Sequence, residues 1–359
     1  MRELPRSSYR TGLMRVWRTR PRIPNGGTRR RRTRSTAGLA AIGALVGTVA
    51  CAPPLPPGEA VVRIPEGATF DVVLDSLESR QIINRRLFVH TYARMRGLDR
   101  FVKAGTYRIE RGAPTRRILD ILTTGRVVTI PMTIPEGFTI VAMAPRIAAT
   151  TGSDSAAVAN RLAKRSLHLD WDVPGPGLEG YMFPDTYRFA EGIRIETVVA
   201  TMLEAYRAYW TPERRDRLRA IGLSENELVT LASIIQAEAV YTDEMTTISS
   251  VYHNRLRIGM RLQADPTVLY ALGGHRPRLL YAAIDSVADN PYNTYAHAGL
   301  PPGPIGAPGA AALDAALNPA DTDYLYFVAR PNGEHIFTRS LREHNNARAQ
   351  VRREASSAR

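Results

Sequence analysis

The segment best suited to acid–base chemistry is residues 224–239, Ser-Glu-Asn-Glu-Leu-Val-Thr-Leu-Ala-Ser-Ile-Ile-Gln-Ala-Glu-Ala, where a carboxyl group falls among aliphatic side chains. Ser224 followed three residues later by Glu227 is a capping box, which predicts that a helix begins here. At roughly 100° per residue, Glu238 lies on the apolar stripe of this helix and Gln236 points away from it. The stripe is formed by Leu228, Leu231, Ile234 and Ile235.

A carboxyl group on a core-facing stripe loses hydration, which disfavours its charged form and raises its pKa. A glutamate in such a place stays protonated near neutral pH and can act as a general acid. The alternative is that the helix ends near Glu238 and that the carboxyl group reaches solvent. The helix alone leaves both interpretations open.

Several loops carry polar and aromatic side chains that could bind hydroxyl and acetamide groups. Residues 178–187 and 291–309 are dense in Gly, Pro and aromatic residues, a composition typical of stiff, irregular surfaces. Each polar side chain there could equally stabilise its own loop. The candidates for substrate contact are Tyr181, Asp185, Asn254, Gln263, Asp265, Thr267, Asn293 and Tyr295.

The sequence offers no support for metal or cofactor chemistry. The seven histidines are scattered, no His-Glu-x-x-His motif occurs, and His335 and His344 lack a third partner at ligand spacing. No Gly-rich phosphate loop follows a strand, and no Ser-His-Asp order stands out. We therefore predict no cofactor and no metal, and we expect His344 to bond the core rather than a substrate.

The charge of the chain is concentrated at its N-terminus. The 359 residues have a net charge of +14, yet residues 1–35 hold 12 Arg and a single acid, so the rest of the chain has only +3. Aromatic residues, among them Trp17, are sparse among these arginines, which argues against nucleic-acid binding. The hydrophobic share of 44% suits a globular body of one large or two modest domains.

The Arg-rich arm directly precedes an apolar run, residues 37–52, which Pro53 and Pro54 end. Positive residues before an apolar segment predict that the arm stays in the cytoplasm and that the body is exported. The run is short for a membrane-spanning helix and long for a signal core, so an anchor and an export signal both fit. Cys51 is the only cysteine, which excludes an internal disulfide, and it is either a lipid attachment site or an inert thiol.

Hydrophobic periodicity predicts a small α+β module after the linker at residues 54–60. Its predicted elements are a strand at 61–64, helices at 69–80 and 85–95, a strand at 105–109 and a helix at 115–122. The module has few groups of catalytic type, which favours a binding or spacer role. Ile-Pro-Glu-Gly-x-Thr recurs at 64–69 and 134–139, and we interpret the two copies as a shared turn rather than a duplicated domain.

The sequence after this module predicts a mainly helical body. Helices are predicted at 141–150, 155–164, 196–210, 212–221 and 248–258. A hairpin is predicted from strands at 324–329 and 335–338 across Pro331-Asn332-Gly333. Residues 345–359 are polar and are expected to fray.

Taken together, several motifs resemble those of the MltG (YceG-like) endolytic murein transglycosylases. The resemblance covers roughly residues 61–346, and the shared order and spacing of the motifs make it specific. The motifs are Leu-Ala-Ser-Ile-Ile-Gln-Ala-Glu at 231–238, Asn-Arg-Leu at 254–256, Gly-Met-Arg-Leu-Gln-Ala-Asp-Pro-Thr-Val at 259–268, Tyr-Asn-Thr-Tyr at 292–295, Gly-Leu-Pro-Pro-Gly-Pro-Ile at 299–305 and Tyr-Leu-Tyr-Phe-Val at 324–328.

This resemblance implies an α+β fold: a small LysM-like βααβ domain followed by a mixed, mainly helical catalytic domain with a short β-hairpin region. It also implies an N-terminal membrane anchor. The corresponding segments are a cytoplasmic arm (1–36), an anchor or signal (37–53), a linker (54–60), a LysM-like domain (61–126), a catalytic domain (127–346) and a polar tail (347–359).

The resemblance further implies a single-pass protein of the cytoplasmic membrane whose body cuts peptidoglycan strands and leaves 1,6-anhydro ends, with synthases of the elongation machinery as further partners. It assigns Glu238 as the catalytic acid and Glu244 a supporting role. Gln236 cannot ionise and is excluded as the acid. A muramidase that activates water through Glu244 or Asp265, and a non-catalytic glycan-binding scaffold, remain alternatives.

Overall fold

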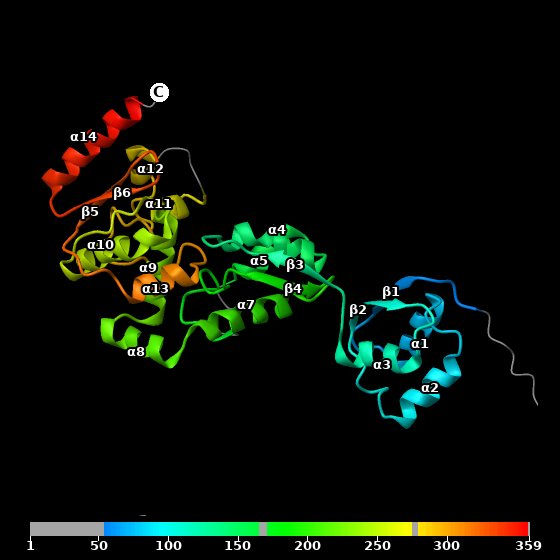
Figure 1. Ribbon diagram of the computed structural model, residues 1–359. Helices are drawn as coiled ribbons and strands as arrows, with labels where there is room; N and C mark the ends of the chain where they lie inside the picture. Colours follow the sequence, from blue (N-terminus) through cyan, green and yellow to red (C-terminus); the bar gives the residue numbers. More distant parts are fainter. Residues whose placement is uncertain (1–53, 165–170, 275–278, 358–359) are drawn as a thin grey trace, which may run out of the picture. The chain divides into compact units, whose positions relative to one another are not determined.

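The computed structural model describes residues 54–164, 171–274 and 279–357 (Figure 1). The predicted cytoplasmic arm, the apolar run and Cys51 lie outside these residues. Within the described ranges, none of the helices has the length and apolar character that crossing a bilayer requires.

The small module has the predicted strand–helix–helix–strand order. Strand β1 (Glu59–Ile64) pairs antiparallel with β2 (Gly105–Glu110), and α1 (Phe70–Ser79) and α2 (Arg86–Met95) connect them. Helix α3 (Thr115–Thr124) follows. Side chains of β1 alternate between exposed and buried, which places one face of the pair on a hydrophobic core with the helices.

The body begins with a second antiparallel pair, β3 (Thr129–Thr133) and β4 (Thr186–Ala190). Between them in sequence lie α4 (Ile140–Thr151) and α5 (Ser155–Leu162), and α7 (Ile195–Tyr209) and α8 (Pro212–Ile221) follow (Figure 1). Their buried residues belong to one hydrophobic core that extends from Met132 to Leu317 and is distinct from the core of the small module. The predicted domain boundary near residue 126 is consistent with two cores but stays a prediction.

Helix α9 (Glu225–Glu238) is the centre of the body. The predicted capping box is confirmed, since Ser224 accepts a hydrogen bond from the Glu227 amide while the Glu227 carboxylate accepts one from the Ser224 amide. All eight residues from 228 to 235 are buried, which is typical of a core helix rather than a surface helix. It packs against α13 (Ala310–Leu317), α10 (Met245–Arg257) and α11 (Asp265–Ala271).

A C-terminal hairpin packs against α10. The predicted hairpin is confirmed as β5 (Tyr326–Ala329) and β6 (His335–Thr338), with Gly333 in the left-handed region of the turn. Short helices η1 (Thr242–Glu244) and α12 (Tyr281–Asp285) complete the body.

The expectation that the C-terminal residues fray is wrong. They form α14 (Leu341–Ser357), which packs against both strands of the hairpin (Figure 1). The Ser340 hydroxyl accepts a hydrogen bond from the Glu343 amide, and the Glu343 carboxylate accepts hydrogen bonds from the amides of Arg339 and Ser340. This cap satisfies the first free amides of the helix, and Ala347 is buried against the body, so a polar sequence is held helical.

Candidate active site

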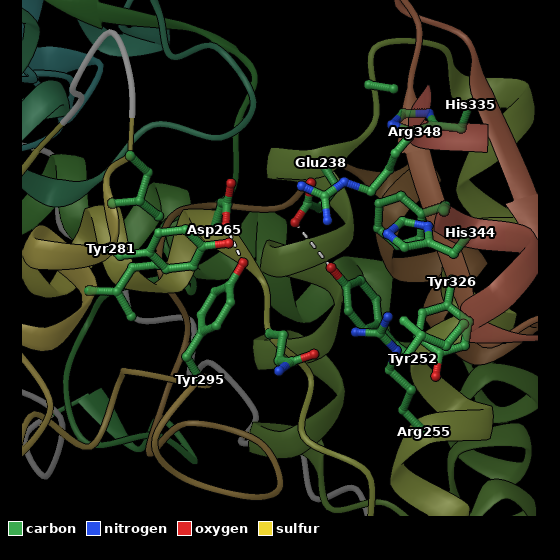
Figure 2. A pocket seen from close by; sticks show the side chains of 16 residues that line it. Glu238, Tyr252, Arg255, Asp265, Tyr281, Tyr295, Tyr326, His335, His344 and Arg348 are labelled. Atoms are coloured by element: carbon green, nitrogen blue, oxygen red, sulfur yellow. Dashed lines mark hydrogen bonds between the residues drawn. The ribbon is translucent and has the colours of Figure 1, made fainter. Parts of the chain in front are cut away.

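Glu238 is the last residue of α9, and its carboxyl group lines a cavity of about 590 Å³ (Figure 2). The helix therefore does end here, as the alternative interpretation required. Glu238 is nevertheless half-buried, because it opens onto a cavity whose walls come from α10, α11, α12, the β5–β6 hairpin and α14. Gln236 points elsewhere, and its side-chain oxygen accepts a hydrogen bond from the Gly309 amide at 2.9 Å.

Burial raises the pKa of Glu238 to about 7. The hydroxyl of Tyr252, 3.1 Å from Oε1, donates a hydrogen bond that lowers this pKa, while the negative charge of Asp265 raises it and the positive charge of Arg255 lowers it. The desolvation effect is the largest of the four. Near neutral pH the group therefore populates both protonation states, as a group that gives and then takes a proton must.

One wall of the cavity carries polar side chains without positive charge, namely Asp265, Gln263 and Tyr295. The Tyr295 hydroxyl donates a hydrogen bond to Asp265 Oδ1 at 2.6 Å, so one oxygen of this carboxylate is already engaged. Gln263 has a φ of 47°, a left-handed conformation that non-glycine residues adopt at a cost. The three side chains were predicted to contact substrate, and all three line the cavity beside Glu238.

Cationic and aromatic side chains form the other side of the cavity. In Figure 2, Asp265, Tyr281 and Tyr295 lie on one side of Glu238, and Arg255, Tyr326 and His344 lie on the other. Arg255 is 7% exposed and donates hydrogen bonds to the carbonyl oxygens of Leu325 and Leu262. Its guanidinium lies 5.4 Å from the centre of the Tyr326 ring, and His344 stacks on that ring.

Glu244 acts on the cavity through His335. Its carboxylate accepts hydrogen bonds from the His335 backbone amide at 2.9 Å and from Nδ1 of the ring at 2.7 Å. His335 lines the cavity, whereas Glu244 does not. A carboxylate on Nδ1 fixes the orientation and tautomer of the imidazole and leaves Nε2 for the cavity. The supporting role of Glu244 stays a prediction, and these contacts give it a physical form, the positioning of His335.

Five of the side chains predicted to contact substrate do not line the cavity, and for them this contact stays a prediction. Tyr181 is fully buried and donates to Asn226, and Thr267 is fully buried against Ala264 and Thr294. The side-chain amide of Asn254 donates hydrogen bonds to the carbonyl oxygens of Thr322 and Tyr324. The side-chain amide of Asn293 donates to the carbonyl oxygens of Ile284 and Val287. Asp185 is exposed, and its carboxylate accepts a hydrogen bond from the Thr186 amide. Their polar groups are used to hold loops together.

Sequence reasoning missed Tyr252, Arg255, His335 and Arg348, and it misplaced His344. We expected His344 to bond the core. Its Nδ1 is indeed buried, but this atom has no hydrogen-bond partner among the described residues, and the ring lines the cavity. Arg255 lies in the motif 254–256, where the neighbouring Asn254 drew the prediction instead. No local pattern could have identified Arg348, because α14 itself was not predicted.

A second carboxyl group in the body has a raised pKa but does not belong to the site. Burial raises the pKa of Glu179 to about 7, opposed by hydrogen bonds from the Ile140 amide and the Tyr270 hydroxyl. Those two donors hold its oxygens between the start of α4 and α11, and Glu179 does not line the cavity. The described residues contain no group of three or more His, Cys, Asp or Glu side chains that could hold a metal ion.

Comparison with known proteins gives one consistent result. A model of the YceG-like family matches residues 62–350. An endolytic murein transglycosylase of Bacillus subtilis is 34% identical over 303 residues, covering 80% of this chain and 83% of that protein. A pneumococcal endolytic murein transglycosylase is 30% identical, and the match spans 58% of its length. The crystal structure of a yceG-like protein from Listeria monocytogenes is 33% identical, with a TM-score of 0.56 over 81% of this chain and all of that one.

Proposed function

Because the chain belongs to the YceG-like family, we propose that it is an endolytic murein transglycosylase that cuts peptidoglycan strands between N-acetylmuramic acid and N-acetylglucosamine. The observation that supports this proposal most directly is Glu238 on the cavity wall, whose pKa of about 7 suits one group to act as acid and then as base. The relatives named endolytic murein transglycosylase support the substrate class.

In the first step, protonated Glu238 gives its proton to the glycosidic oxygen as the bond to the anomeric carbon breaks. The sugar ring passes through an oxocarbenium-like state. The carboxylate of Asp265 on the opposite wall is the charge that can stabilise this cation. The Glu238 carboxylate that remains is stabilised by the hydrogen bond from Tyr252.

In the second step, the Glu238 carboxylate takes the proton from the 6-hydroxyl group of the muramoyl residue. The oxygen of that hydroxyl then attacks the anomeric carbon of its own ring and closes the 1,6-anhydro bridge. Glu238 is again protonated and ready for the next cycle. General acid–base catalysis of this kind contributes about 10² to 10⁴ in rate, and holding the 6-hydroxyl in line supplies much of the rest.

The second candidate is a muramidase, and the observation in its favour is Asp265, the other carboxylate among the described residues that line the cavity. A hydrolase needs such a group to activate water or to bond the anomeric carbon. Against this role stands the hydrogen bond from Tyr295, which already occupies one oxygen of the Asp265 carboxylate. Intramolecular closure needs only Glu238, so it agrees better with the site.

The test is product analysis with the full-length chain in detergent and uncrosslinked glycan strands as substrate. We expect internal cleavage products that carry 1,6-anhydromuramoyl ends, each lighter by one water than the hydrolytic product in a mass spectrum. Glu238→Gln abolishes them, and Glu204→Gln, which removes an exposed carboxylate on α7, does not. Reducing ends would establish the muramidase, and binding without cleavage would establish a scaffold.

The proposal extends to the rest of the chain. The Arg-rich arm and the apolar run support attachment to the cytoplasmic membrane with the body outside. The strand–helix–helix–strand order of the small module supports a LysM-like role in holding glycan near the site. A membrane-attached enzyme that cuts strands internally would act on nascent strands beside the synthases and end their elongation.

A further inference from the structure

The cavity is divided into two walls of opposite charge. Asp265 lies on one wall and Arg255 lies with His344 on the other, and the Arg348 side chain extends from the second wall toward Glu238 in the view of Figure 2. Arg348 projects from α14 and is exposed, yet no carboxylate in the described part of the chain forms an ion pair with its guanidinium. Arg255 is held by backbone carbonyl oxygens rather than by an acid. Among the described residues, Arg348 therefore carries a positive charge without an ion-pair partner, whereas the charge of Arg255 also acts on Glu238.

Packing against Tyr326 holds Arg255 and His344 of this wall in place. The Tyr326 ring has the Arg255 guanidinium at 5.4 Å and the His344 ring at 5.3 Å. His344 and Arg348 are four residues apart on α14, so the helix presents both on one face. The positive charges of Arg348 and Arg255 both lower the pKa of His344, beside the larger effect of burial. Neighbouring cations that disfavour a further positive charge would favour a bound anion.

The two sugars of the proposed substrate differ in charge. N-acetylglucosamine is neutral, whereas a muramoyl residue carries a lactyl group that ends either in a carboxylate or in an amide-linked peptide with carboxylates of its own. Guanidinium groups bind carboxylates through charge-assisted hydrogen bonds, while a neutral glycan needs no arginine. An unpaired arginine at the rim of a glycan cavity therefore has a matching group on the muramoyl residue.

We propose that Arg348, with Arg255 deeper in the cavity and His344 between them, forms a subsite for a carboxylate of the acidic substituent on the muramoyl residue. This inference rests on the proposed function and adds the group that the enzyme recognises besides the sugar ring. The subsite holds the acidic substituent of the muramoyl residue on the cationic wall and leaves the anomeric carbon of its ring between Glu238 and Asp265. It favours strands that keep their carboxylates over neutral glycan.

The experiment uses the full-length chain in detergent and three substrates: uncrosslinked strands with peptides, strands freed of peptides that keep the lactyl carboxylate, and the latter after chemical amidation of that carboxylate. Arg348→Gln is compared with Arg342→Gln, which removes the same charge from α14 at a position that does not line the cavity. Values of kcat and KM are measured from the anhydro ends released. Dissociation constants are measured separately in the Glu238→Gln background, where no cleavage intervenes.

We expect Arg348→Gln to raise KM and Kd about three- to tenfold for a carboxylate-bearing strand, to leave kcat within about twofold, and to change nothing for amidated strands. An effect on peptide-bearing strands assigns the carboxylate to the peptide, and an effect on peptide-free strands assigns it to the lactyl group. Equal loss on amidated strands, loss with Arg342→Gln as well, or no loss at all overturns the subsite. An inactive wild type would refute the proposed function instead, while the Kd values would still decide the subsite.

Discussion

Replacing Glu238 by glutamine should stabilise the fold while it abolishes catalysis. In the folded chain the pKa of Glu238 is about 7, against an ordinary value of 4.5. Between these two values the unfolded chain releases the proton and the folded chain keeps it, so wild-type stability falls as pH rises through this window and is level above it. Glutamine has nearly the same shape as the protonated glutamate but does not titrate, so the stability of the variant does not fall in this pH window.

The size of the effect follows from the two pKa values. At 1.36 kcal/mol per pKa unit, the gap corresponds to about 3 kcal/mol, an upper bound because the cavity admits some water. The difference in unfolding free energy between Glu238→Gln and wild type should be near zero at pH 4.5 and should reach its plateau above pH 7. The steepest part of the curve lies between pH 5 and 7.

Urea unfolding across this pH range, followed by tryptophan fluorescence, measures the difference, since Trp171 and Trp210 both belong to the body. Glu204→Gln serves as the control for the loss of one negative charge at an exposed site. A difference between Glu238→Gln and wild type that does not change from pH 5 to 7 would refute the enclosed carboxyl group. That result would also remove the physical basis for the proposal that Glu238 acts first as acid and then as base.

Three further substitutions probe the surroundings of this acid. Tyr252→Phe removes the hydrogen bond that lowers the Glu238 pKa, so the alkaline limb of the kcat profile should move up by about one pH unit; an unmoved limb contradicts the assignment. Glu244→Gln and His335→Gln should each lower kcat/KM about tenfold, which is less than the loss caused by Glu238→Gln. Because the two residues act together, the double variant should lose no more than either single variant. Losses that add up in the double variant would refute this coupling. Gly180→Ala should destabilise the body by about 2 kcal/mol or more in urea unfolding, because φ at this residue is +84° and a Cβ would lie 2.3 Å from Pro304. Gly177→Ala is the control, because the space around Gly177 is open. Equal effects of the two substitutions would refute the packing argument.

Local features of the sequence were enough for the elements that carry the acid. The capping box at Ser224 specified where α9 begins, since its hydrogen bonds join residues only three apart. The hairpin from residue 326 to 338 followed from alternation and a turn with glycine for the same reason. The polar C-terminus was mispredicted because its helix depends on packing against that hairpin.

The candidate site was only partly predictable. Gln263, Asp265 and Tyr295 were chosen because they are polar side chains in stiff loops near the acid, and they do line its cavity. Asn293 and Thr267 met the same criterion, yet their polar groups bond to the neighbouring loop. A polar side chain in a loop can serve the ligand or the backbone, and which one it serves depends on where the loop's own carbonyl and amide groups point.

By itself, the sequence determined that a glutamate stands at the end of an apolar helix, because periodicity and capping act over a few residues. Only the tertiary structure decided that this carboxyl group is partly shielded from water, in a cavity rather than on an open surface. The shield comes from a hairpin and a final helix some 90 to 110 positions further along the chain, among them Phe327, His335 and Arg348. Desolvation is a property of everything that surrounds a group, so no short stretch of sequence can specify it.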